Sequence, residues 1–187
     1  LSARYSSTTA AIGWNVILGG SSDTDNSSIW LIVWGEKSVH GIFPKGSKAG
    51  LIHEDMGEVT VETTAGIAGT RMRAYQDRWQ WKCGIALKDW RYVCRIGSID
   101  ISDLLTTPDV IINSMIKAIH RIPNLRLGKP VFYMNRTVFQ QLDIARRDTV
   151  IAGGGITYDN VDGKIQYGFR GIPIRVCDAL TQAEALV

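Results

Sequence analysis

The residues best suited to chemistry are histidines, cysteines and one lysine-rich loop, and none of them has the spacing of a known site. Residues 41–48 have the glycine spacing of a phosphate-binding loop, but Ser47 stands where the lysine must follow the second glycine. His53 and the acid after it begin like a zinc-protease motif, yet Gly57 occupies the position of the second histidine. The sequence therefore predicts a non-enzymatic protein with no metal and no cofactor. A nucleotide-dependent enzyme that uses 41–48 is the weakest alternative.

Cysteine number and overall composition set the class of protein. Cys83, Cys94 and Cys177 are odd in number and form no CxxC pair, so we interpret them as buried free thiols of a chain made in a reducing cytoplasm. The chain has 187 residues, 45% hydrophobic and 21% charged, which is a globular balance. Its longest apolar run, Ile29 to Trp34, is too short to cross a membrane, and no membrane partner is expected.

Charge alternates in blocks along the chain. The net charge of +3 conceals two basic blocks, 71–95 and 117–147, which are flanked by acidic ones. Such blocks are typical of surfaces that meet complementary surfaces or a polyanion, while two solvated faces are an equally good explanation from charge alone. We take basic residues from these two blocks and from the loop 41–48 as candidate subunit contacts. They are Lys45, Lys48, Arg71, Arg73, Arg78, Arg146 and Arg147.

The segment 71–96 has the clearest pattern, and we interpret it as one long bent strand or two consecutive strands. Tyr75, Trp79 and Trp81 recur at period two on one face. This pattern favours a strand that buries its aromatic face, in which case Trp81→Ala costs about 3–5 kcal/mol. The alternative is a nucleic-acid-binding module that uses the basic aromatic strand 71–95 to stack bases.

The remaining elements predict an α+β fold. Runs 29–34 and 39–43 indicate a β-hairpin, and short strands are expected at 58–62 and 131–134. A last pair of strands is expected at 165–169 and 172–176, around a turn at Arg170 and Gly171. Thr107 followed by Pro108 predicts a helix start, and Asn135 is expected to cap a second helix.

Several ordered segments, taken together, are more informative than any single motif. They are Ser28–Gly35, Val39–Gly50, Trp90–Ile96, His120–Asn124, Val131–Arg136 and Phe169–Arg175. With them, the chain from about Arg4 to Leu186 resembles the major capsid proteins of short-tailed bacteriophages. The resemblance implies the Hong Kong 97 type capsid fold, which has an axial domain and an elongated peripheral domain.

The same resemblance implies that parts of the family's architecture are missing or rearranged. The N-terminal arm, the extended hairpin loop and the spine helix would precede Leu1, so the chain is expected to be the C-terminal part of such a protein. The order of the matching segments implies a rearranged connectivity. We expect a linker at 1–28, a strand-rich peripheral-type region with parts of the axial sheet at 29–104, and an axial-type α+β region at 105–187.

A structural role follows from the resemblance. It implies a capsid subunit that assembles with copies of itself into pentamers and hexamers of an icosahedral shell. Scaffolding or cement proteins and non-specifically held packaged DNA are the other partners implied. The expected location is the virion capsid, after synthesis in the cytoplasm of a bacterial host.

Overall fold

The computed structural model describes residues 15–20, 25–46, 49–62, 69, 71–105, 108–148, 156–161 and 164–187. The chain divides into two compact units, one formed by Leu1–His40 with Leu87–Val187 and the other by Gly41–Ala86. We call the first the sheet unit and the second the ribbon unit. How the axial-type and peripheral-type regions map onto these units stays a prediction.

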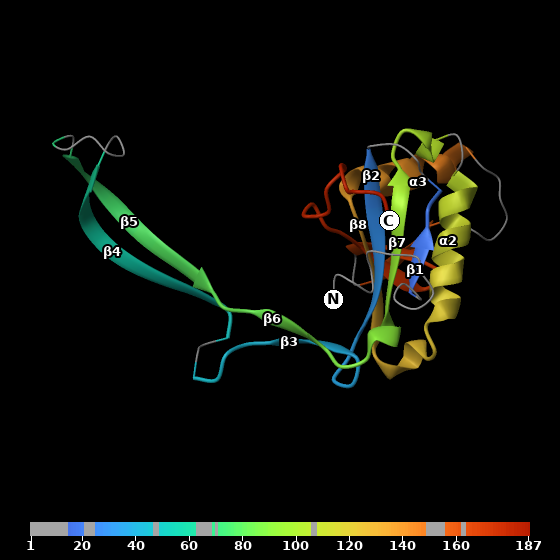
Figure 1. Cartoon of the computed structure of the whole chain (residues 1–187), viewed down its shortest axis with the longest axis horizontal. Coiled ribbons are helices and arrows are strands. Elements are labelled where there is room, and N and C mark those ends of the chain that lie inside the picture. The colour runs from blue at the N-terminus through green and yellow to red at the C-terminus, as the bar shows by residue number, and fades with distance from the viewer. Residues whose placement is uncertain are drawn as a thin grey trace. The chain divides into compact units, whose positions relative to one another are not determined.

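A mixed β-sheet forms the centre of the sheet unit (Figure 1). Its strand order is β1-β7-β2-β8-β11-β10-β9. The short strands β3 and β6 pair with each other off this path, and their residues 41–42 and 84–86 belong to the ribbon unit. Three of the pairs, β1 with β7, β2 with β3 and β8 with β11, are parallel. The strands are β1 (Val16–Leu18), β2 (Asn26–Trp34), β3 (Val39–Ile42), β6 (Gly84–Leu87), β7 (Val93–Asp100), β8 (Lys129–Met134), β9 (Ile156–Val161), β10 (Lys164–Phe169) and β11 (Ile172–Val176).

The core lies between this sheet and two helices, α2 (Pro108–Arg121) and α3 (Arg136–Asp148). Strand β2 alternates, because Ile29, Leu31 and Val33 are fully buried in the core while Trp30 and Trp34 lie on the opposite face. The helices add apolar side chains at helical spacing. These are Ile111, Met115 and Ala118 from α2 and Val138 and Leu142 from α3.

Local signals for helix starts and turns are confirmed. Helix α2 begins at Pro108, although Thr107 lies outside the described residues. The side-chain oxygen of Asn135 accepts a hydrogen bond from the backbone N–H of Thr137 at 2.8 Å, which caps α3. The turn between β10 and β11 has positive φ at both Arg170 and Gly171, as a tight hairpin of the primed type requires.

Other sequence expectations differ from the structure. The predicted hairpin of 29–34 with 39–43 is wrong, since β2 pairs antiparallel with β7 on one edge and β8 on the other, and meets β3 only at Trp34 and Val39. The predicted linker 1–28 contains β1, which extends the sheet, and the buried start of β2. Both differences arise because β1 and β2 pair with strands that lie far along the chain, and a local sequence pattern cannot predict such partners.

The long element expected at 71–96 is several elements. It divides into β5 (Arg71–Trp81), β6 and the beginning of β7, with a 3₁₀ turn at Trp90–Tyr92 before β7. Two further 3₁₀ turns lie at Asp103–Leu105 and Leu125–Leu127. Among the described helices, none combines the length and hydrophobicity needed to cross a membrane.

The segment after β11 returns across the sheet unit and is tied to it by hydrogen bonds. The backbone N–H of Glu184 donates to Asn26, and its carboxylate accepts from Ser28 Oγ at 3.0 Å and from Arg95 at 2.8 Å. Arg95 and Glu184 expose only 13% and 18% of their side chains. This little-exposed ion pair therefore holds the C-terminal segment on the sheet face opposite the helices.

Loss of this ion pair is expected to destabilise the chain. Glu184→Ala leaves Arg95 partly buried without its carboxylate and should lower the free energy of unfolding by about 2 kcal/mol, as measured by urea titration. Glu36→Ala, at an exposed turn, is the control and should change it by less than about 0.5 kcal/mol. Equal effects of the two substitutions would mean that the C-terminal segment is not held by this pair.

The cysteines differ in environment, which corrects the expectation of three buried thiols. Cys94 is buried in the core, Cys177 is half-buried and Cys83 is exposed. Burial raises the pKa of the Cys94 thiol from 9.0 to about 12. The fold thus favours the neutral thiol. The free energy of unfolding therefore keeps its full value below pH 9 and falls as the pH rises toward 12.

Thiol labelling should separate these cysteines. At pH 8 we expect an alkylating reagent to modify Cys83 readily, because its side chain is accessible, while Cys94 reacts only after unfolding in denaturant. Mass spectrometry of digested protein measures the modification at each site. Rapid labelling of Cys94 in the native chain would contradict its place in the core.

Candidate assembly surfaces

The ribbon unit contains a long two-stranded antiparallel sheet formed by β4 (Leu51–Glu62) and β5 (Figure 1). The register runs from Leu51 opposite Trp81 to Glu62 opposite Arg71. Within the described residues of the ribbon unit, this sheet has neither a third strand nor a helix on either face. A two-stranded ribbon is at best marginally stable in water unless something else covers it.

A β-bulge interrupts the ribbon near its middle. The register shifts between Asp55 and Glu58, and Gly57 adopts a positive φ of 67°. The Asp55 carboxylate accepts a hydrogen bond from the Gly57 backbone N–H at 2.8 Å. Because one extra residue enters β4 here, the odd-numbered positions of β4 change from one face of the ribbon to the other.

One face of the ribbon carries exposed aromatic side chains on the side of the bulge nearer Trp81. Its members, which we call the aromatic patch, are Leu51, His53, Trp79 and Trp81. Trp79 and Trp81 expose 61% and 67% of their surface. His53 stacks on Trp79 with ring centroids 4.1 Å apart, and its Nε2 lies 3.5 Å from an Asp77 oxygen.

The other face carries aliphatic side chains on the far side of the bulge. This aliphatic patch consists of Val59, Val61, Met72 and Ala74, in which Val59 pairs with Ala74 and Val61 with Met72. Met72 exposes 49% and Val61 38% of its surface. The ribbon therefore presents two separate apolar patches on opposite faces.

Charges between the patches are largely neutralised across the strands. Arg78 lies opposite Glu54 at 3.6 Å, and Arg73 lies 3.4 Å from Glu58, which also accepts a hydrogen bond from the Tyr75 hydroxyl at 3.1 Å. These pairs are exposed, so each contributes at most about 1 kcal/mol. Between 51 and 81 the chain has five acidic and three basic side chains, so the basic strand lies in a slightly acidic ribbon.

The interpretation that β5 buries its aromatic face is wrong for this chain. Tyr75, Trp79 and Trp81 share one face as predicted, but Tyr75 is 83% exposed and both tryptophans are mostly exposed. Alternating aromatic residues indicate that a face is suited to burial. They do not indicate whether the covering surface belongs to the same chain.

The candidate contact residues are only partly brought together. Arg71, Arg73 and Arg78 are exposed on β5, and Lys45 is exposed before β4. Arg146 and Arg147 belong to the last turns of α3, but their side chains, like the whole of Lys48, lie outside what the structure describes. Their role as subunit contacts stays a prediction.

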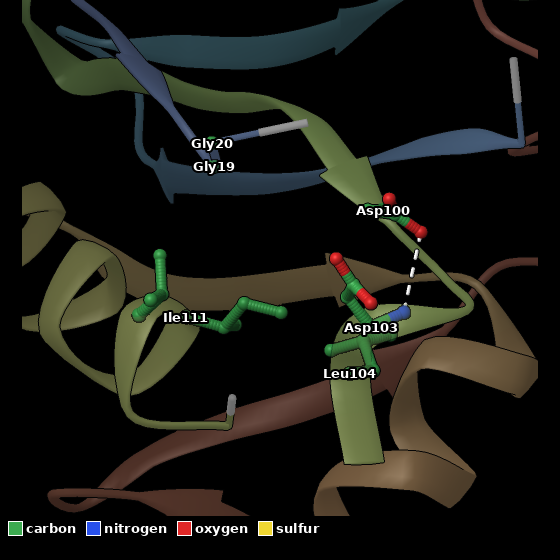
Figure 2. Close-up of a pocket in the computed structure, with 7 residues that line it drawn as sticks. Gly19, Gly20, Asp100, Asp103, Leu104 and Ile111 are labelled. Atoms are coloured by element: carbon green, nitrogen blue, oxygen red, sulfur yellow. Dashed lines mark hydrogen bonds between the residues drawn. The ribbon is translucent and has the colours of Figure 1, made fainter. Parts of the chain in front are cut away.

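A small pocket in the sheet unit was not anticipated from the sequence. It has a volume of about 100 Å³ and lies between Gly19, Asp100, Leu104 and Ile111 (Figure 2). The Asp100 carboxylate accepts hydrogen bonds from Ser102, and these bonds lower its pKa. Asp100 therefore stabilises the local turn, and the pocket has room for little more than water.

Groups suited to metal binding are also scarce. The described part of the chain contains no cluster of three or more histidine, cysteine, aspartate or glutamate side chains that could hold a metal ion. His53, whose motif begins like that of a zinc protease, instead stacks on Trp79 and lies near an Asp77 oxygen. The surfaces with the clearest potential to act are therefore the two patches of the ribbon.

Substitution of an exposed ribbon tryptophan is expected to leave the fold intact. Trp81→Ala should change the free energy of unfolding by less than about 1 kcal/mol, because the indole is 67% exposed. Phe132→Ala, in the core, should cost about 3–5 kcal/mol in the same urea titration. A loss of that size for Trp81→Ala would mean that the isolated chain covers this face.

Comparisons with known proteins place these surfaces in context. None of the curated proteins compared with the chain matches it. A chain in the near-atomic cryo-EM structure of bacteriophage epsilon15 has 27% sequence identity and a TM-score of 0.58 over 94% of this chain. This chain spans about half, 53%, of the length of that one. The likeness confirms the predicted α+β fold of the Hong Kong 97 type. A family model, major capsid protein GP7, matches residues 1–187, and the chain belongs to that family of phage major capsid proteins.

Proposed function

We propose that this chain is the shell-forming part of a structural capsid subunit and that the β4–β5 ribbon is one of its contacts with other copies. Membership of a major capsid protein family supports the structural role and a place in the virion capsid. The observation that carries the proposal is the exposure of Trp79, Trp81 and Met72 on a ribbon that has no core of its own. Exposed apolar patches of this kind mark interaction surfaces.

The finer features of the assembly belong to the same proposal. The subunits form pentamers and hexamers of an icosahedral shell that encloses packaged DNA, with scaffolding or cement proteins as further partners. Synthesis takes place in the cytoplasm of the bacterial host. The subunit has no catalytic role, and its work is the repetition of moderate contacts between identical surfaces.

Binding of nucleic acid through the basic aromatic strand is the less favoured function. The three arginines of β5 face or approach the acidic side chains of β4, and acids outnumber bases on the ribbon. Affinity for DNA comes mainly from uncompensated positive charge that meets phosphate. A slightly acidic ribbon supplies little of that charge.

The test is the assembly of the full-length protein that contains this chain. Trp79→Ser combined with Trp81→Ser removes exposed apolar surface, so particle yield by sedimentation should fall at least tenfold while the thermal melt of the subunit shifts little. The matched control is Gln76→Ser with Gln80→Ser, on the same strand but the opposite face, and it should assemble normally. Normal particle yield from the tryptophan variant would refute the ribbon as a contact.

A further inference from the structure

The two apolar patches of the ribbon cannot be covered by one flat partner. They lie on opposite faces and on opposite sides of the Gly57 bulge. On the aromatic side, the opposite face carries the polar residues Glu54, Arg78 and Gln80 and one half-buried apolar residue, Ile52. On the aliphatic side, the opposite face likewise carries charged residues, among them Glu62 and Arg73. Each half of the ribbon thus has one mainly apolar and one mainly polar face, and the apolar face of one half continues into the polar face of the other.

We propose that the ribbon is inserted between two other copies of the chain, one covering the aromatic patch and the other covering the aliphatic patch. This inference rests on the proposed function, because it takes copies of the same subunit as the partners. The bulge brings the aliphatic residues of both strands onto one face. If β4 kept residue 57 and alternated regularly, Val59 and Val61 would lie on the same face as Leu51 and away from Met72 and Ala74.

The size of each patch supports several partners and argues against one stable dimer. Two indoles that are 61% and 67% exposed offer on the order of 200–300 Å² of surface. A stable two-chain interface usually buries roughly 800 Å² on each partner. Neither patch reaches that area, so each is a secondary contact that becomes effective when a subunit is held by several neighbours at once.

The charges of the ribbon support another protein surface as the occupant. Glu54 with Arg78 and Glu58 with Arg73 form exposed cross-strand pairs at the rim of the patches. A polyanion would be repelled by the slightly acidic ribbon. A lipid surface would require a single apolar face, whereas the apolar residues of the ribbon are divided between its two faces. In a shell, the abundant protein surface is the subunit itself.

Photo-crosslinking inside assembled particles tests the proposal. A tagged full-length chain carries Trp79→benzoylphenylalanine, Met72→benzoylphenylalanine or both, and it is mixed as a small fraction with unlabelled wild-type chain before assembly. After irradiation, each single label should give tagged dimers. The double label should also give tagged trimers, because its two faces meet two different neighbours.

The matched control carries both labels on one face, at Trp79 and Trp81, and should give dimers with few trimers. Dilution with unlabelled chain is essential, because neighbours that also carried labels would crosslink to further copies and produce larger products. Mass spectrometry of the crosslinked peptides should place the attachment sites of positions 79 and 72 in different partner molecules. A labelled chain can also be absent from the particles although circular dichroism shows that it is folded. That result supports a tight contact at the labelled position, because the bulky label prevents it.

The outcomes separate this inference from the proposed function. Dimers from both single labels, but no trimers from the opposite-face double label, would overturn the two-neighbour arrangement and leave the ribbon as a contact with one copy. Crosslinks from neither position, in particles that contain the labelled chain, would overturn the ribbon as a contact altogether. Crosslinks to DNA or to a different protein would overturn a second copy as the occupant.

Discussion

Two β-strands have two faces and no interior, and this constraint governs the ribbon unit. Every apolar side chain that β4 and β5 place on a face must meet water or another molecule. The exposed tryptophans and aliphatic residues therefore gain most of their stabilisation only when a partner arrives. Cross-strand ion pairs and the stack of His53 on Trp79 keep the ribbon ordered at small energetic gain.

The sheet unit, in contrast, buries its own apolar side chains. Its core is closed by the chain itself, since β2 is paired on both edges and the helices cover one face. The other face is held in part by the C-terminal segment through Arg95 and Glu184. The chain therefore joins a unit that buries its own apolar side chains to one that leaves apolar patches exposed.

The sequence predicts the parts of this structure that local chemistry determines. Pro108 at a helix start, Asn135 as a cap and the Arg170–Gly171 turn act within a few residues, so their patterns could be recognised. The three-residue strand β1 is too short for any periodicity, and the partners of β2 lie far along the chain. For the ribbon, alternation correctly grouped Trp79 and Trp81 on one face, but their exposure depends on whether the cover comes from the same chain.

The attachment of the C-terminal segment has a consequence for the order in which the protein is made. Ser28 and Glu184 are 156 residues apart, and the hydrogen bond between them cannot form until nearly all of the described chain has left the ribosome. The ribbon, by contrast, pairs residues close in sequence and can form early. A nascent chain would thus expose the apolar patches of its ribbon before the C-terminal segment is attached to the sheet.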